Sequence, residues 1–153
     1  MSPRTLYRRI ALAEVVSWAL LLTGMFLKYV TGTTDLGVKV FGLVHGVVFI
    51  TFCLLTVLVS VNQRWTYRRT VLGLASAVPP FLTVWFERRM ERAGALEGGW
   101  RLGHADARPE NRLEHVLHAL LARPLVAVSV GLVAVTALTG LALVVGAPVG
   151  AQG

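Results

Sequence analysis

Hydrophobic positions gather in four long segments, at residues 10–30, 38–61, 70–86 and 124–145, and polar or basic stretches separate them. A helix needs about 20 apolar residues to cross the ~30 Å hydrocarbon core of a bilayer. The first, second and fourth segments meet this length, while the third, with about 17 residues, is at the lower limit. The pattern therefore predicts an all-α integral membrane helical bundle.

One further helix is predicted outside these segments, at residues 109–122. Pro109 suits the first turn of a helix. Apolar side chains then recur at spacings of three and four and form one face, which consists of Leu113, Val116, Leu117, Leu120 and Leu121. We expect this amphipathic helix to lie at the level of the lipid headgroups. The chain then divides into a three-helix membrane domain (1–92), a basic connector (93–123), a C-terminal transmembrane helix (124–146) and a tail (147–153).

Composition and charge agree with a membrane protein. The chain is 55% hydrophobic, has a mean hydropathy of +0.65 and carries a net charge of +7. Its arginines flank apolar segments and are not interleaved with aromatic residues, so we expect the lipid bilayer and not nucleic acid as the partner. The first segment is longer than the ~7–15 apolar residues of a signal peptide and no A-x-A-like site follows it. We therefore expect a multi-pass protein of the plasma membrane.

The basic residues bear on how the third segment lies. Lysine and arginine concentrate on the cytoplasmic side of membrane proteins. If residues 70–86 turn back within the membrane, all thirteen arginines lie on one side and the two lysines on the other. Pro79-Pro80, in the middle of this segment, would kink a helix. We expect four hydrophobic helices and leave open whether the third crosses, as well as the side on which residues 87–123 lie.

Small and polar residues form a stripe along each of the first two spans. These stripes are Glu14, Ser17, Leu21, Gly24 and Lys28, and Gly42, His45, Gly46, Phe49, Cys53, Thr56 and Ser60. The short link between the spans makes them antiparallel neighbours, and small residues four apart let helix backbones approach closely. We predict a hairpin in which Ser17, Gly24, Gly42 and Gly46 are the helix-packing residues.

Four polar residues are candidates for function: Glu14, Lys28, His45 and Glu87. Glu14 lies about 6–9 Å inside the first span, where a lone carboxylate is costly. It is either a proton- or cation-handling group or a structural anchor. His45 should differ from Glu14 in depth by about 10–15 Å, so no direct acid–base pair is expected. Lys28 and Glu87 would join Asp35 and Lys39 in an ion-pair group if the third helix spans.

Motifs for metal or cofactor binding and for catalysis are missing from the pattern. His115 and His118 have ligand-like spacing on the amphipathic helix, but a structural zinc site needs four ligands and no cysteine pair is present. No phosphate-binding glycine loop and no H-E-x-x-H motif occur, and we expect no Ser-His-acid constellation. The expectation is a protein that is not an enzyme, with no cofactor and no metal.

From Arg8 to Arg89 the chain resembles a small bacterial integral-membrane family, domain of unknown function (DUF) 3817, also called the HG family after its His-Gly pair. The residues that carry the resemblance are Arg9-Ile10-Ala11, Glu14, Ser17, Trp18, Leu27-Lys28-Tyr29, Val40-Phe41-Gly42, His45-Gly46-Val47-Val48-Phe49, Trp65, Pro79-Pro80-Phe81 and Phe86-Glu87-Arg88. The resemblance implies three helices, with a third helix that spans, and makes everything after Arg92 an extension. It implies no activity.

The expected function is that of a small accessory or scaffolding membrane subunit. Ala127-x-x-x-Gly131 and Thr136-x-x-x-Gly140 offer further close-packing faces on the last helix, so we expect a homo-oligomer or a membrane-protein partner. The alternative is a small transporter or channel that moves protons or another ion along a path touching Glu14.

Overall fold

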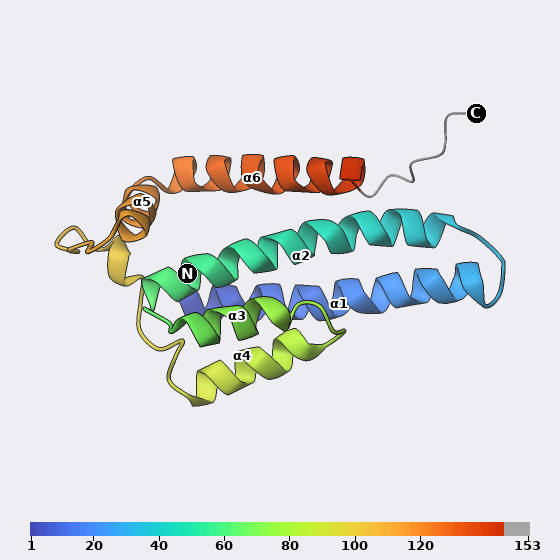
Figure 1. Ribbon diagram of the computed structural model, residues 1–153, viewed down its shortest axis with the longest axis horizontal. Helices are drawn as coiled ribbons and strands as arrows, with labels where there is room; N and C mark the ends of the chain where they lie inside the picture. Colours follow the sequence, from blue (N-terminus) through green and yellow to red (C-terminus); the bar gives the residue numbers. More distant parts are fainter. Residues whose placement is uncertain (146–153) are drawn as a thin grey trace.

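A computed structural model describes residues 1–145 of the chain, and all regular structure in this part is helical (Figure 1). The helices are α1 (Pro3–Tyr29), α2 (Leu36–Asn62), α3 (Tyr67–Ala75), α4 (Leu82–Arg92), α5 (Arg112–Leu121) and α6 (Pro124–Val145), with a 3-10 turn at Arg101–Gly103. Among them, α1, α2 and α6 are long and apolar enough to cross a membrane. The predicted all-α bundle is confirmed, while the tail at 147–153 lies outside the described residues.

Helices α1 and α2 form the antiparallel hairpin expected from the short link (Figure 1). The first helix begins earlier than the apolar pattern indicates, because the Ser2 hydroxyl caps it by accepting a hydrogen bond from the Thr5 N–H and Pro3 occupies its first turn. The basic head is therefore the start of α1. At the other end, Gly24 packs directly on Gly37, so closely that a Cβ on Gly24 would lie 2.6 Å from the Gly37 carbonyl carbon.

The third apolar segment forms two short helices in place of the single helix expected. The chain turns between α3 and α4 at Pro79-Pro80 and Phe81, whose φ of +67° is in the left-handed region. With 9 and 11 residues, α3 and α4 extend only about 14 and 17 Å at 1.5 Å per residue, too short for the hydrocarbon core. The end of α4 returns to the start of α3 (Figure 1), where the Trp65 indole donates to the Ala95 carbonyl at 2.8 Å. The structure thus has the re-entrant form of this segment.

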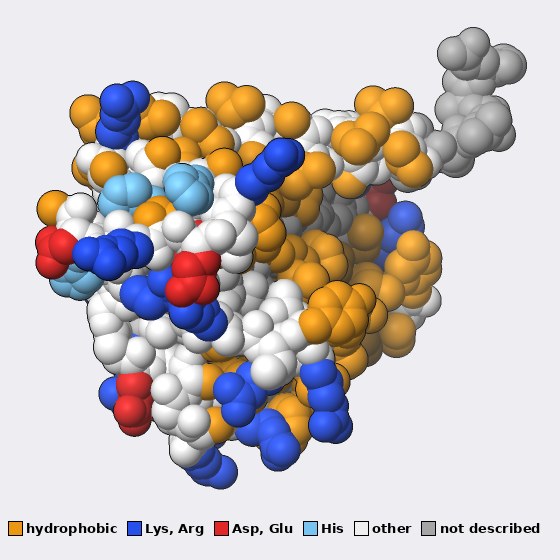
Figure 2. All heavy atoms as spheres, turned by 60° about the vertical axis from the view of Figure 1, so that its left-hand side comes forward, with side chains coloured by type: hydrophobic (Ala, Val, Ile, Leu, Met, Phe, Trp, Pro, Cys, Tyr) orange, Lys and Arg blue, Asp and Glu red, His pale blue; other side chains and the backbone are white. Residues whose placement is uncertain are grey.

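The return of α4 sorts the basic residues between the two ends of the bundle. One end of the bundle is where α1, α3 and α6 begin and α2 and α4 end (Figure 1), and the thirteen arginines fall in or next to these helix ends and in the connector, so we call it the arginine end. Many basic side chains are visible on this side of the molecule in Figure 2. An ion pair between Arg4 and Glu91 joins α1 to α4 there. Lys28 and Lys39 flank the α1–α2 link at the opposite, lysine end. This is the charge distribution that the re-entrant alternative predicted.

The connector folds against the arginine end, and α6 then runs back beside α2 (Figure 1). Leu96 and Leu102 of this connector are fully buried. The amphipathic helix predicted at 109–122 is confirmed as α5, although it begins at Arg112 after the cap residue Asn111, so that Pro109 precedes the helix and is not in its first turn. No residue of α6 is buried within the described chain, as expected for an apolar helix whose surroundings are lipid.

Candidate functional site: a buried polar cluster in the hairpin

Three polar side chains meet inside the α1–α2 hairpin. The Ser17 hydroxyl lies 2.9 Å from Nδ1 of His45 and 3.4 Å from Oε2 of Glu14, and the latter two atoms are 3.9 Å apart. Glu14 is fully buried, Ser17 is 2% exposed and His45 is 9% exposed. The Trp18 ring, with its centroid 4.4 Å from that of His45, covers the histidine. We call Glu14, Ser17 and His45 the polar cluster.

The predicted depth difference of about 10–15 Å between Glu14 and His45 is wrong, and the register of the hairpin explains why. The glycine contact places Gly24 opposite Gly37. Ser17 lies seven residues before Gly24 and His45 eight residues after Gly37, so the two differ in depth by only about 1.5 Å. Glu14, one turn further along, reaches the same level through its side chain. The sequence estimate aligned the two apolar segments at the ends that the link joins, near residues 30 and 38, whereas in the structure Gly24 lies opposite Gly37.

We expected no Ser-His-acid constellation. This expectation is wrong, because the polar cluster contains a serine, a histidine and an acid. Its geometry nevertheless differs from that of a hydrolase triad. In a triad the serine and the acid contact opposite ring nitrogens of the histidine. Here Ser17 and Glu14 both approach Nδ1 of His45. The arrangement ties α1 to α2, as interhelical hydrogen bonds do in membrane proteins.

A second buried layer lies between the polar cluster and the arginine end, and sequence reasoning missed it. The Tyr7 hydroxyl lies 3.2 Å from Oγ1 of Thr56, and Oγ1 of Thr83 donates to the Ala11 carbonyl at 3.3 Å. Aromatic rings surround this layer, with centroids 5.4 Å apart for Tyr7 and Phe52. The periodicity of Thr56 on the second stripe was the one available signal. Through this layer α4 is held against α1.

The expected ion-pair group at the lysine end forms only in part. Lys39 pairs with Asp35 at 2.6 Å, and this hydrogen bond lowers the pKa of the Asp35 carboxyl. The Lys28 ammonium lies over the Tyr29 ring, 5.1 Å from its centroid. Glu87 is 2% exposed and lies near Arg4 and Arg8 at the arginine end, because α4 turns back. Its predicted place beside Lys28 is therefore wrong.

The two glycines of the His-Gly stretch do not make the close helix contact. A Cβ on Gly42 would lie 3.8 Å from Cδ1 of Leu21, and one on Gly46 would meet no atom within 4 Å. Both residues line a groove of about 330 Å³ between α2 and α6, together with Ala142. The close approach of α1 and α2 is made by Gly24 and Gly37 instead. Gly24 is the predicted packing residue that this contact supports, and Ser17 packs through its hydroxyl.

Of the two histidines of α5, His118 contacts the 3-10 turn and His115 contacts only the residue that caps its own helix. Nδ1 of His118 lies 2.7 Å from the Leu102 carbonyl oxygen, and Nδ1 of His115 lies 2.9 Å from that of Asn111. Within residues 1–145 no three His, Cys, Asp or Glu side chains are grouped so that they could hold a metal ion.

Glu114 is the centre of a charged network that fixes α5 to the end of α2. Its Oε1 accepts from Arg101 at 2.6 Å and from Arg64 at 3.2 Å, and its Oε2 accepts from the Glu110 N–H at 2.9 Å. Burial alone would raise the pKa of this carboxyl, but the hydrogen bonds and the arginine charges outweigh burial and lower the pKa to about 2. The carboxylate is therefore charged at neutral pH.

The three long apolar helices, with polar groups gathered inside the hairpin, define a helical integral membrane protein. The family described as "Domain of unknown function (DUF3817)" matches residues 4–92, which is more than half of the chain, and the protein belongs to this family. The whole polar cluster lies within the matched segment.

The comparison with curated proteins finds a relative in Streptomyces coelicolor, named "Putative membrane protein SCO5905". It is 49% identical over 88 residues, which are 57% of this chain and 10% of the relative. The chain thus matches only a tenth of the length of this relative. No solved structure matches the chain.

Proposed function

We propose that the protein is a small, multi-pass accessory subunit of the plasma membrane that presents a rigid helical surface to another membrane protein and catalyses no reaction. The observation that carries this proposal is the enclosure of the polar cluster. On the side of the lysine end, the backbones at Gly24 and Gly37 are in direct contact. Because this contact closes the hairpin on that side of the polar cluster, the cluster is better suited to linking two helices than to forming an ion path across the membrane.

A partner within the membrane is supported by two further observations. The relative in Streptomyces coelicolor contains the matched segment as one tenth of a longer chain named as a membrane protein, so this fold occurs beside further polypeptide. In α6, a Cβ on Gly131 or Gly140 would meet no atom within 4 Å. Small residues on an apolar helix allow another helix to approach closely. We propose α6 as the contact, with the arginine end in the cytoplasm.

Photo-crosslinking in native membranes tests this role. A photoreactive residue at Val128, which is 61% exposed and one turn from Gly131, should give one adduct of discrete size. The matched control is the same residue at Val16 of α1, which is 58% exposed and should give none. Gly131→Leu should remove the adduct by filling the contact face. Monomer alone at both positions, or equal adducts at both, would contradict the proposal.

A proton- or ion-conducting role for Glu14 is the second candidate, favoured by one observation. Within the described residues Oε1 of Glu14 is buried without a hydrogen-bond partner, and ionisable groups inside membranes mark ion pathways in many proteins. Proteoliposome flux separates the two functions. Flux that disappears in Glu14→Gln and persists in the exposed control Glu97→Gln would establish conduction. The accessory role predicts no flux above that of empty liposomes in any of the three proteins.

A further inference from the structure

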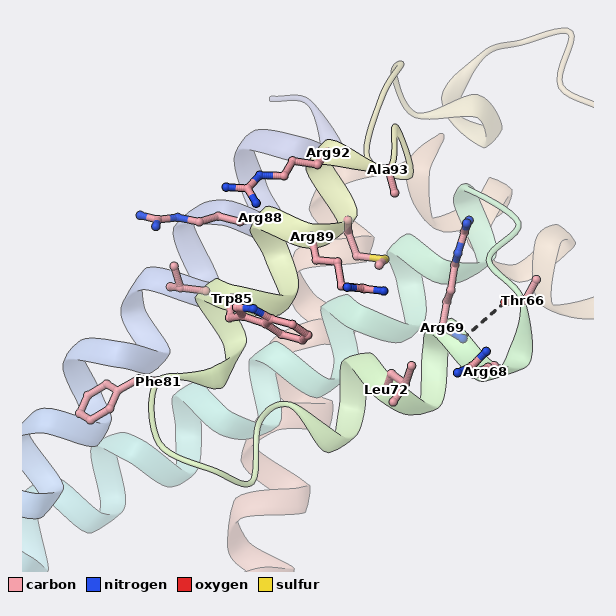
Figure 3. A pocket seen from close by; sticks show the side chains of 12 residues that line it. Thr66, Arg68, Arg69, Leu72, Phe81, Trp85, Arg88, Arg89, Arg92 and Ala93 are labelled. Carbon is pink, nitrogen blue, oxygen red and sulfur yellow. Dashed lines mark hydrogen bonds between the residues drawn. The ribbon is translucent and has the colours of Figure 1, made fainter.

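A groove of about 970 Å³ lies between α3 and α4 at the arginine end. Its volume is within the ~300–1,000 Å³ of typical small-molecule sites. The lining contains no acidic residue and five arginines, which are Arg68, Arg69, Arg88, Arg89 and Arg92. Figure 3 shows Arg69 of α3 and Arg89 of α4 extending into the space between the two helices. The groove is therefore strongly positive and open to solvent or lipid headgroups.

Helix α4 separates its charges so that the arginines of the groove are not neutralised. Glu87 and Glu91 lie one turn apart on the face toward α1, where Glu87 is buried and Glu91 pairs with Arg4. Of the arginines of α4, Arg89 extends toward α3, whereas Arg88 and Arg92 extend to the opposite side of the helix (Figure 3). Within the described residues no ion pair joins any of the five groove arginines to a carboxylate. Unpaired guanidinium groups that line one groove repel one another, and an anion between them relieves this repulsion.

Beside these charges the groove carries exposed apolar side chains. Leu72 is 50% exposed, Phe81 46% and Trp85 57%. The Trp85 ring lies against the Arg89 guanidinium, whose carbon is 5.6 Å from the ring centroid (Figure 3). Tryptophan beside arginine is typical of the membrane–water interface, where the ring contacts acyl chains and the charge contacts headgroups. The apolar part distinguishes this groove from a site for a small soluble anion.

We propose that the α3–α4 groove binds the phosphate of an anionic phospholipid, with an acyl chain of the same lipid lying over Trp85 and Phe81. Guanidinium groups bind phosphate oxygens through paired, charge-assisted hydrogen bonds. Clusters of basic residues next to membrane spans bind anionic lipids in this way. Arg69 and Arg89 hold the phosphate from the two sides of the groove. The site depends on the membrane location of the chain and not on its role as an accessory subunit.

Quenching of Trp85 by brominated lipid measures this binding directly. The purified full-length protein is placed in phosphatidylcholine bilayers that contain a minor fraction of brominated phosphatidylglycerol or, for comparison, of brominated phosphatidylcholine. Subtracting the quenching of Trp85→Phe from that of the unsubstituted protein isolates Trp85 from the other three tryptophans. The anionic lipid should quench Trp85 several-fold more than the neutral lipid at the same fraction. Equal quenching by the two lipids would overturn the proposal without any arginine variant.

The arginine variants then locate the phosphate. Arg69→Gln/Arg89→Gln should lower the apparent affinity for the anionic lipid by on the order of tenfold. The matched control, Arg108→Gln/Arg112→Gln, removes the same charge from exposed positions outside the groove and should leave the preference unchanged. Equal losses in both variants would show attraction by net charge alone and refute the site. Loss of the lipid preference on addition of millimolar inorganic phosphate would assign the groove to a soluble anion instead.

Discussion

The glycine contact between α1 and α2 gives a prediction with a matched control in the same hairpin. Alanine at either Gly24 or Gly46 gains about 1 kcal/mol of helix propensity. At Gly24, however, the new Cβ would lie 2.6 Å from the carbonyl carbon and 2.8 Å from the oxygen of Gly37. At Gly46 it would meet nothing within 4 Å. The two substitutions therefore have the same local chemistry and opposite tertiary consequences.

The size of the stability change follows from how closely the new Cβ would approach the Gly37 carbonyl. Carbon atoms in contact prefer a separation of about 3.5–4.0 Å, so Gly24→Ala must move the two helices apart by roughly 1 Å. Overpacking of this kind costs about 1–3 kcal/mol, part of which the gain in helix propensity offsets. We expect Gly24→Ala to lower the free energy of unfolding by up to about 2 kcal/mol and Gly46→Ala to raise it by up to about 1 kcal/mol.

Reversible unfolding in mixed micelles, with sodium dodecyl sulfate as the denaturant and far-ultraviolet circular dichroism as the signal, measures both values. Each variant is compared with the unsubstituted protein in the same lipid-detergent mixture. If Gly24→Ala is as stable as Gly46→Ala, the register of the hairpin described here is wrong, and with it the depth match of Ser17 and His45.

Two further predictions concern the polar contacts. Ser17→Ala removes the hydroxyl that lies 2.9 Å from Nδ1 of His45. It should lower the free energy of unfolding by about 0.6–1.7 kcal/mol in the same assay. The control Thr51→Ala removes only a hydrogen bond within α2 and should lower it by less. Because the lowered pKa of Glu114 favours the folded state above its ordinary value of 4.5, docking of α5 should be complete at neutral pH and be lost as the pH falls toward 2. Hydrogen exchange of α5 amides as a function of pH checks this prediction. Glu114→Gln should remove the acid step, whereas the exposed control Glu97→Gln should leave it. An acid step that survives Glu114→Gln would contradict the assignment.

The sequence predicts the helices well because hydrophobic runs of this length have few alternatives in a bilayer. Residues 38–61 and 124–145 agree closely with α2 and α6. The apolar pattern did not predict that residues 3–9 belong to α1. These residues are helical because Ser2 caps the helix and Pro3 begins it, and a capped helix continues through polar residues. Helix boundaries of this kind depend on local capping, which hydropathy does not record.

The third segment shows two sequence signals in conflict. The family resemblance implied a helix that spans, whereas the arginine distribution favoured a return and Pro79-Pro80 indicated only a kink. In the structure the proline pair falls in the turn between α3 and α4, where its missing N–H groups leave no helical hydrogen bond unmade. Charge and backbone chemistry together were the better guide.

The candidate site was predicted in its members but not in its geometry. Glu14, Ser17 and His45 were all singled out, yet their meeting depends on the register that Gly24 and Gly37 set. Hydrophobic periodicity shows which face of a helix is buried but not how far one helix is shifted along its neighbour. A shift of one turn between two neighbouring helices changes the relative depth of their side chains by about 5.4 Å, which is enough to separate the members of a hydrogen-bonded cluster.

If residues 70–86 turn back at the membrane as α3 and α4 do in the structure, all arginines lie on one side. Accessibility labelling of single cysteines, in a Cys53→Ser background, tests it in intact cells with a membrane-impermeant maleimide. The cysteines replace Ser2 and Glu97 at the arginine end and Thr33 at the lysine end. We expect cysteines at positions 2 and 97 to be labelled from the same side of the membrane and a cysteine at position 33 to be labelled from the opposite side. Labelling of the Glu97 position together with that of Thr33 would show that the third segment crosses the membrane.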